Sequence, residues 1–205
     1  AFEKCDSLIR TVVSEDNASY SSLDGVLYSK DQTSLIAFPC GVSGEFTIPE
    51  DVTDIESCAF YFCYQLTQIN MYNNVINIGD NAFAYCWNLI TVRLSDNLKS
   101  LGDDAFFDCL CLTKLYLPAN LTSIGTDALL GAQDSTGHLE YYLVDGVYCV
   151  EGSYAEEYVY SLGLTPISTA DTRYDPDTDI SVSSVFENGI RIDVCEYLEG
   201  SIYDE

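Results

Sequence analysis

Residues 69–91 have the sequence INMYNNVINIGDNAFAYCWNLIT, and the chain repeats the chemistry of this 23-residue row on both sides. The rows that begin at Phe46, Val92 and Leu115 align with it without a gap: FTIPEDVTDIESCAFYFCYQLTQ, VRLSDNLKSLGDDAFFDCLCLTK and LYLPANLTSIGTDALLGAQDSTG. A fixed period of this length indicates a solenoid, because one row cannot bury its own apolar residues and must stack on its neighbours. The sequence therefore predicts stacked rows around one continuous core.

Aligned positions keep their chemical character from row to row. The apolar columns hold Ile48, Met71, Leu94 and Leu117; Ile55, Ile78, Leu101 and Ile124; Ala59, Ala82, Ala105 and Ala128; Phe60, Phe83, Phe106 and Leu129; and Leu66, Leu89 and Leu112. Within a row, Ile69–Tyr72 alternates apolar and polar residues, which is the period of a half-buried strand. We expect these strands to be parallel neighbours in successive rows.

The remainder of each row favours a short helical turn. Ser57, Asp80, Asp103 and Thr126 share a column, and such side chains cap helix N-termini. The Ala-Phe-x-x-Cys stretch that follows would turn its Ala, Phe and Cys inward.

Three of the nine cysteines form a column of their own, Cys63, Cys86 and Cys109, and Ala132 takes their place in the last row. Free cysteine is often a small buried side chain, so we expect a stack of reduced thiols. Disulfides between neighbouring rows or a metal ladder are the alternatives. Whether Cys5, Cys40, Cys58, Cys111, Cys149 and Cys195 pair is not decided by the sequence.

These rows resemble the BspA-like class of bacterial leucine-rich repeats, whose rows follow LPxxLTSIGxxAFxxCxxLTxI. Leu115–Ala128 (LYLPANLTSIGTDA) matches that pattern almost residue for residue. Leu23–Gly41 is similar to the β-hairpin insert of such arrays, and Cys149–Pro166 is similar to the unit that closes them. Asp-Gly-Val at Asp24 and again at Asp145 indicates two related hairpin strands. The resemblance implies an α/β fold: a right-handed leucine-rich-repeat solenoid with parallel strands, short helical turns and a β-hairpin insert.

The domain organisation follows from these boundaries. We expect a leucine-rich-repeat domain over residues 1–167, with rows over 46–137, the hairpin insert over 23–41 and the closing unit over 139–167. Residues 168–179 are expected to form an acidic linker, and 180–205 a small β-hairpin or the start of a truncated further domain. Ala1–Leu8 matches Ala59–Leu66, so the chain is expected to begin inside a row, as a trimmed or processed fragment of a longer array.

The charge balance excludes some classes of partner. The chain has 33 acidic and 8 basic residues and a net charge of −25. Nucleic-acid binding depends on Lys and Arg, and anionic bilayers repel an acidic protein, so neither partner is expected. No stretch approaches the roughly 18 apolar residues of a membrane span.

The sequence contains no assembled catalytic or metal motif. His138 is the single histidine, and GxSxG, P-loop and HExxH patterns are missing. Asp175, Asp177 and Asp179 open like a calcium loop, but Ile180 stands where such a loop needs Gly, and Phe186 where it needs Glu. We therefore expect no enzyme activity, no catalytic residue, no metal site and no cofactor.

A binding role would use the outward positions of the strands. The candidate binding residues are Gln68, Asn70, Tyr72, Thr91, Arg93, Lys114 and Tyr116, and Ser95 is also expected to face outward. Aromatic and Arg side chains dominate many protein interfaces, although Thr, Tyr, Arg and Lys on a strand also serve β-propensity and solubility.

The resemblance implies a secreted or cell-surface protein of a host-associated bacterium with an adhesive or protein-binding role. The expected partner is an extracellular protein of the host or of the bacterium. The alternative is a glycan-binding module that uses aromatic platforms such as Trp87. The sequence does not identify the partner, the binding face or the oligomeric state.

Overall fold

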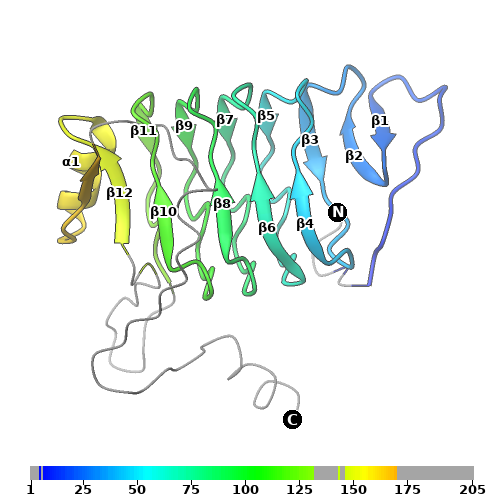
Figure 1. Cartoon of the computed structure of the whole chain (residues 1–205). Coiled ribbons are helices and arrows are strands. Elements are labelled where there is room, and N and C mark those ends of the chain that lie inside the picture. Colours follow the sequence, from blue (N-terminus) through cyan, green and yellow to red (C-terminus); the bar gives the residue numbers. More distant parts are fainter. Residues whose placement is uncertain (1–4, 6, 132–142, 144–145, 170–205) are drawn as a thin grey trace, which may run out of the picture.

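The computed structural model describes residues 5, 7–131, 143 and 146–169 of the 205-residue chain. Figure 1 shows an elongated solenoid in which one long and one short strand recur in each turn. The long strands are β4 (Gly44–Thr47), β6 (Leu66–Asn70), β8 (Thr91–Arg93), β10 (Lys114–Tyr116), β12 (Gly146–Val150) and, after the helix, β13 (Ile167–Thr169). The second set, which we call the short strands, consists of the four-residue β3 (Ser34–Ala37) and the two-residue strands β5 (Asp54–Ile55), β7 (Asn77–Ile78), β9 (Ser100–Leu101) and β11 (Ser123–Ile124).

The long strands run parallel and lie in sequence order, as the alternation predicted. Ile69 pairs with Val92 between β6 and β8, and β10 lies beside β8 but forms its ladder with β12. The long strands thus make two parallel sheets, β4-β6-β8 and β10-β12-β13. The short strands form one sheet in the order β3-β5-β7-β9-β11. The predicted solenoid of parallel strands is confirmed.

The core is a continuous apolar stack between these sheets. Every residue of the predicted apolar columns is buried. At its centre, the rings of Phe38, Phe60, Phe83 and Phe106 stack along the axis with centroid separations of 5.1, 4.7 and 5.1 Å. Leu129 is buried in the same column of the last row. Apolar stacking therefore joins each row to the next.

Glycine allows the rows to approach closely at one corner. A Cβ on Gly102 would lie 2.5 Å from the backbone nitrogen of Asp80 and 2.5 Å from the carbonyl carbon of Gly79. A Cβ on Gly79 or Gly125 would likewise meet backbone atoms of the row before it. In the first aligned row this position is Glu56, which is exposed.

The stretch behind each short strand is a series of turns, so the predicted helical turn is wrong. Cys58, Asn81, Asp104 and Asp127 share one column of left-handed residues, and Phe62, Tyr85 and Asp108 share another. A left-handed residue ends a right-handed helix. The backbone instead bonds to the next row: the Phe60 N–H donates to the carbonyl of Ala82 at 2.8 Å. We call these stretches the turn segments.

The predicted helix-capping column has a different role for the same reason. Asp80 Oδ1 accepts from the backbone N–H of Asp103 at 2.9 Å, and Asp103 Oδ1 accepts from that of Thr126 at 2.6 Å. Ser57 Oγ accepts from Asp80 in the same way, at 3.2 Å. Each side chain caps the next row and not its own.

An antiparallel meander stands at the N-terminal end. Strand β1 (Tyr20–Leu23) pairs with β2 (Val26–Ser29), and β2 pairs with β3. The connecting residues Asp24 and Gly25 have φ values of 51° and 86°, which a two-residue hairpin turn requires. The predicted hairpin insert is therefore present, and β1 begins three residues before Leu23. The second Asp-Gly-Val triplet was misinterpreted, because Val147 lies in β12, which is parallel to both neighbours.

The C-terminal end carries the helix that the closing motif predicted. Helix α1 (Tyr154–Ser161) begins after Ser153, whose side chain accepts from the Glu156 N–H, and buries Ala155 and Val159. Strand β13 then pairs with β12, so Ser168 and Thr169 belong to a strand and not to the predicted linker. The rest of that linker, the expected hairpin over 180–205, His138 and the Asp175–Asp179 motif lie outside the described residues.

The cysteine column is longer than predicted and partly oxidised. Cys40 stands 23 residues before Cys63 and forms a disulfide with it, with a Cα–Cα distance of 4.2 Å. The prediction of a fully reduced stack is thus wrong for Cys63. Cys86 and Cys109 are free and buried, and their thiols donate to the carbonyls of Phe60 and Phe83 at 3.1 and 3.2 Å. Burial raises the pKa of the Cys86 thiol to about 12, which keeps it protonated.

Candidate functional site

The outer surface of the long strands brings most of the predicted binding residues together. Two columns of side chains cross the strands β4, β6, β8, β10 and β12, and we call them the strand face. The first column runs Glu45, Gln68, Thr91 and Lys114, and the second runs Thr47, Asn70, Arg93, Tyr116 and Tyr148. None of these side chains is fully buried. All of the predicted binding residues except Tyr72 therefore share one surface.

Charge changes along the strand face. Its N-terminal part carries Glu45 and the Gln68–Asn70 pair, in which Gln68 Nε2 donates to Asn70 Oδ1 at 3.1 Å. The next strands carry Arg93, which is exposed, and Lys114, which is half-buried. Two of the chain's eight basic residues thus lie on adjacent strands of one face. That part of the face suits an acidic or polar contact.

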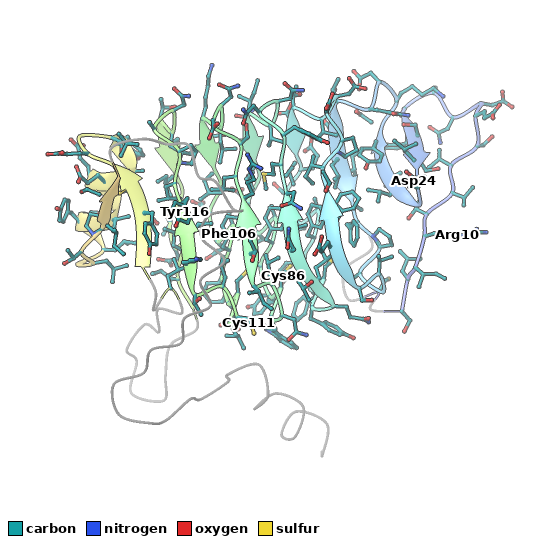
Figure 2. The ribbon with its side chains drawn as sticks, in the orientation of Figure 1. Arg10, Asp24, Cys86, Phe106, Cys111 and Tyr116 are labelled. Atoms are coloured by element: carbon teal, nitrogen blue, oxygen red, sulfur yellow. A yellow bond between two sulfur atoms is a disulfide. The ribbon has the colours of Figure 1, made fainter. Side chains whose placement is uncertain are left out.

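Two tyrosines extend the basic part of the strand face. Tyr116 and Tyr148 occupy opposite positions on β10 and β12, and their rings stack with centroids 4.3 Å apart. Figure 2 shows Tyr116 on β10, in the C-terminal half of the described solenoid. Stacked rings lose little conformational entropy on binding, and this favours a contact surface. Sequence reasoning missed Tyr148, because residues 131–145 interrupt the 23-residue spacing before β12.

Tyr72 and Ser95 were also predicted to point outward, and the structure places only Tyr72 at the surface. Tyr72 follows β6 and has 47% of its surface exposed, so it borders the strand face. Ser95 was expected beside it, but its exposure is 0%. Because β8 ends at Arg93, the alternation stops there, and Ser95 Oγ accepts from the Asn97 N–H at 3.2 Å. Ser95 is therefore a turn residue and not a surface contact.

A second surface, the aromatic cluster, lies on the turn segments. Its members are Tyr61, Phe62, Tyr64, Tyr85, Trp87 and Phe107, all half-buried. Phe62 and Tyr85 stack at 4.6 Å, and Tyr64 stacks on Trp87 at 5.9 Å. Trp87 Nε1 is buried without a hydrogen-bond partner among the described residues. The row alignment contained this signal, since aromatic residues recur at positions 61, 62 and 64 of one row and 85 and 87 of the next.

The short-strand side is occupied by structural bonds. Asn77 Nδ2 donates to Asp54 Oδ1, and Ser100 Oγ donates to Asn77 Oδ1, both at 2.7 Å. The neighbouring acids repel one another: burial first, and then the charges of Asp127, Asp103 and Asp80, raise the pKa of Asp104 above its usual 3.8. The side chains of Asp54, Asn77 and Ser100 thus hold neighbouring rows together.

Catalytic and metal chemistry gain no support from the described part of the chain. Within it, no three His, Cys, Asp or Glu side chains cluster so that they could hold a metal ion. None of its helices is long and apolar enough to cross a membrane.

Sequence comparison identifies the repeats. The family model of the BspA type leucine rich repeat region matches residues 36–137 in six copies. The chain therefore belongs to the BspA-type leucine-rich-repeat family. No curated protein matches the chain significantly.

Solved structures share the fold. A leucine rich cell surface protein of Faecalibacterium prausnitzii superposes with a TM-score of 0.62 at 24% identity, covering 84% of this chain and 44% of that one. The pneumococcal vaccine antigen PcpA gives 0.54 at 18% identity, covering 80% and 51%. A leucine-rich repeat protein of Bacteroides capillosus gives 0.51 at 25% identity, covering 64% and 98%. The chain spans about half the length of the first two.

Proposed function

We propose that this chain is a non-catalytic binding module of a cell-surface or secreted bacterial protein, and that its strand face recognises an extracellular protein of the host or of the bacterium. The observation that carries the proposal is the gathering of Arg93, Lys114 and the Tyr116–Tyr148 stack on adjacent strands of a chain with a net charge of −25. If the basic residues served only solubility, they would not need to lie on the same face, so their gathering favours a binding role. The cell-surface description of the Faecalibacterium relative supports the location.

Charge reversal on the strand face tests this proposal. Arg93→Glu combined with Lys114→Glu should abolish capture of the partner in a pull-down from extracellular proteins, because the change reverses the face's basic charge. The matched control is Arg10→Glu with Lys99→Glu, which makes the same charge change at exposed positions outside the strand face. Figure 2 shows Arg10 at the N-terminal end of the solenoid, away from Tyr116. Equal loss of capture in both double variants would indicate a general charge effect and refute a site on the strand face.

A glycan is the second candidate partner, and the aromatic cluster favours it. The stacked rings of Tyr64 and Trp87, 5.9 Å apart, form a platform of the kind on which sugars pack. A glycan array with the parent chain and with Trp87→Ala separates the two functions. Array binding that is lost in Trp87→Ala and unchanged in the strand-face variant would support the glycan function and reject the protein function.

A further inference from the structure

The N-terminal end of the solenoid contains a cavity that reaches the disulfide. The cavity has a volume of about 630 Å³ and lies between residues 11–17 and the first turns of the solenoid. Cys40 contributes to its lining, whereas its disulfide partner Cys63 does not and has an exposure of 0%. Cavities of this size hold small molecules in proteins. Of the two disulfide cysteines, Cys40 is therefore the one next to the cavity.

The chemistry of the lining selects the kind of molecule. Its walls combine apolar side chains such as Leu27, Ile36 and Phe38 with hydroxyl and amide groups such as those of Thr11 and Asn17. No described residue of the lining is charged. The whole chain carries a net charge of −25, so its field repels anions that approach the cavity. A small uncharged molecule is favoured.

We propose that this cavity is a thiol-exchange site, in which a small uncharged thiol reacts with the Cys40–Cys63 disulfide and remains attached to Cys40. The thiolate sulfur of the incoming molecule forms a bond to Cys40 Sγ, and the Cys40–Cys63 bond breaks. Cys63 leaves as a thiolate and takes up the proton that the incoming thiol gave up. One thiol is consumed and one is released, so no further oxidant or reductant takes part.

The column order determines which sulfur is attacked. A thiolate displaces the leaving sulfur from the opposite side, so attack on Cys40 comes from the side away from Cys63. Attack on Cys63 is disfavoured, because Cys63 has an exposure of 0% and does not line the cavity, and the next cysteine of the column, Cys86, is buried as well. The mixed disulfide therefore forms on Cys40, which is the one of the two disulfide-bonded cysteines that lines the cavity.

The structure also provides a place for the released thiol. Cys63 Sγ lies 4.0 Å from the carbonyl oxygen of Phe38. Cys86 and Cys109 donate to the equivalent carbonyls of the following rows at 3.1 and 3.2 Å. A freed Cys63 can therefore adopt the hydrogen bond that the reduced members of the column already make.

The experiment uses the folded chain and the neutral thiol 2-mercaptoethanol. After acid quenching and alkylation, peptide mass spectrometry should find 2-mercaptoethanol on Cys40 and the alkylating agent on Cys63. Its anionic analogue, 2-mercaptoethanesulfonate, should react about tenfold more slowly at low salt, and 1 M salt should remove most of the difference.

A variant at the cavity tests access directly. Val12 lines the cavity and is 75% exposed, so Val12→Trp narrows the cavity without disturbing the core. It should slow adduct formation several-fold, whereas Leu23→Trp, on an exposed β1 residue outside the lining, should not. Circular dichroism confirms that both variants fold. Adduct on Cys63 in place of Cys40, equal rates in the two variants, or reaction only at unfolding concentrations of urea would each overturn the proposal.

Discussion

Replacing Phe83 by Ala should remove the central contact of the core. Phe83 is fully buried, and its ring lies between those of Phe60 and Phe106 at 4.7 and 5.1 Å, with interplanar angles of 14° and 4°. Loss of a buried Phe ring costs about 3–5 kcal/mol, including about 0.5–1.5 kcal/mol for each ring pair. Domains are stable by only about 5–15 kcal/mol, so the variant should remain folded but become marginal.

Urea unfolding measures this loss of free energy, and it can be followed by the fluorescence of Trp87, which lies in the same row as Phe83. At a slope of about 2 kcal/mol per molar, a loss of about 4 kcal/mol lowers the midpoint by about 2 M. Asn70→Ala, on the strand face, is the control and should change the unfolding free energy by no more than about 0.5 kcal/mol. Comparable midpoint shifts for the two variants would refute the assignment of inward and outward residues. Phe83→Leu should cost less than Phe83→Ala, because Leu129 occupies the same column naturally.

Three further predictions concern the contacts between rows. Asp104→Asn should raise the melting temperature at pH 7, because the raised pKa of Asp104 means that its ionised form destabilises the folded state. In a series of melting curves at decreasing pH, the gain should disappear below pH 3.8, the ordinary pKa of the carboxyl group. A gain that stays constant with pH would contradict this cause. Gly102→Ala should lower the free energy of unfolding in urea by more than about 2 kcal/mol, because the added Cβ would meet backbone atoms of the preceding row. Glu56→Ala is the control in the same column, and it should change the free energy of unfolding little because Glu56 is exposed. Replacing both Cys40 and Cys63 by Ala should lower the unfolding free energy of the oxidised chain by about 3 kcal/mol, because the disulfide closes a loop with a separation of 23 residues; unchanged stability would argue against this bond.

Much of the fold was predictable because the sequence repeats its chemistry with a constant period. The columns of Phe60 and Leu66 indicated the core, and the alternation around Ile69 indicated the strands. The turn segments were not predictable as turns, because Ala-Phe-x-x-Cys suits a helix locally. The backbone bonds to the next row, which outweigh that local preference, are made between residues 22 positions apart, as in Phe60 to Ala82.

The candidate site was predicted less completely than the fold. Period-two alternation placed Arg93 and Tyr116 on one face, but it could not place Tyr148, which follows an interruption of the repeat. It also placed Ser95 outside, because alternation does not show where a strand ends. The Cys40–Cys63 bond was missed because Cys40 lies in the hairpin insert, and its 23-residue distance from Cys63 was not recognised as part of the column.

The side-chain bonds from Asp80 to Asp103 and from Asp103 to Thr126 all have the same direction along the chain. Each of these rows therefore offers a side-chain oxygen as acceptor to the next row and a backbone N–H as donor to the row before it. A duplicated row of 23 residues would find its partners on both sides wherever it was inserted between existing rows. A duplication whose length is not a multiple of 23 residues would leave one of these hydrogen bonds unmade. Such arrays can consequently gain or lose whole rows by unequal recombination while keeping their fold, and their length becomes a property that selection can adjust.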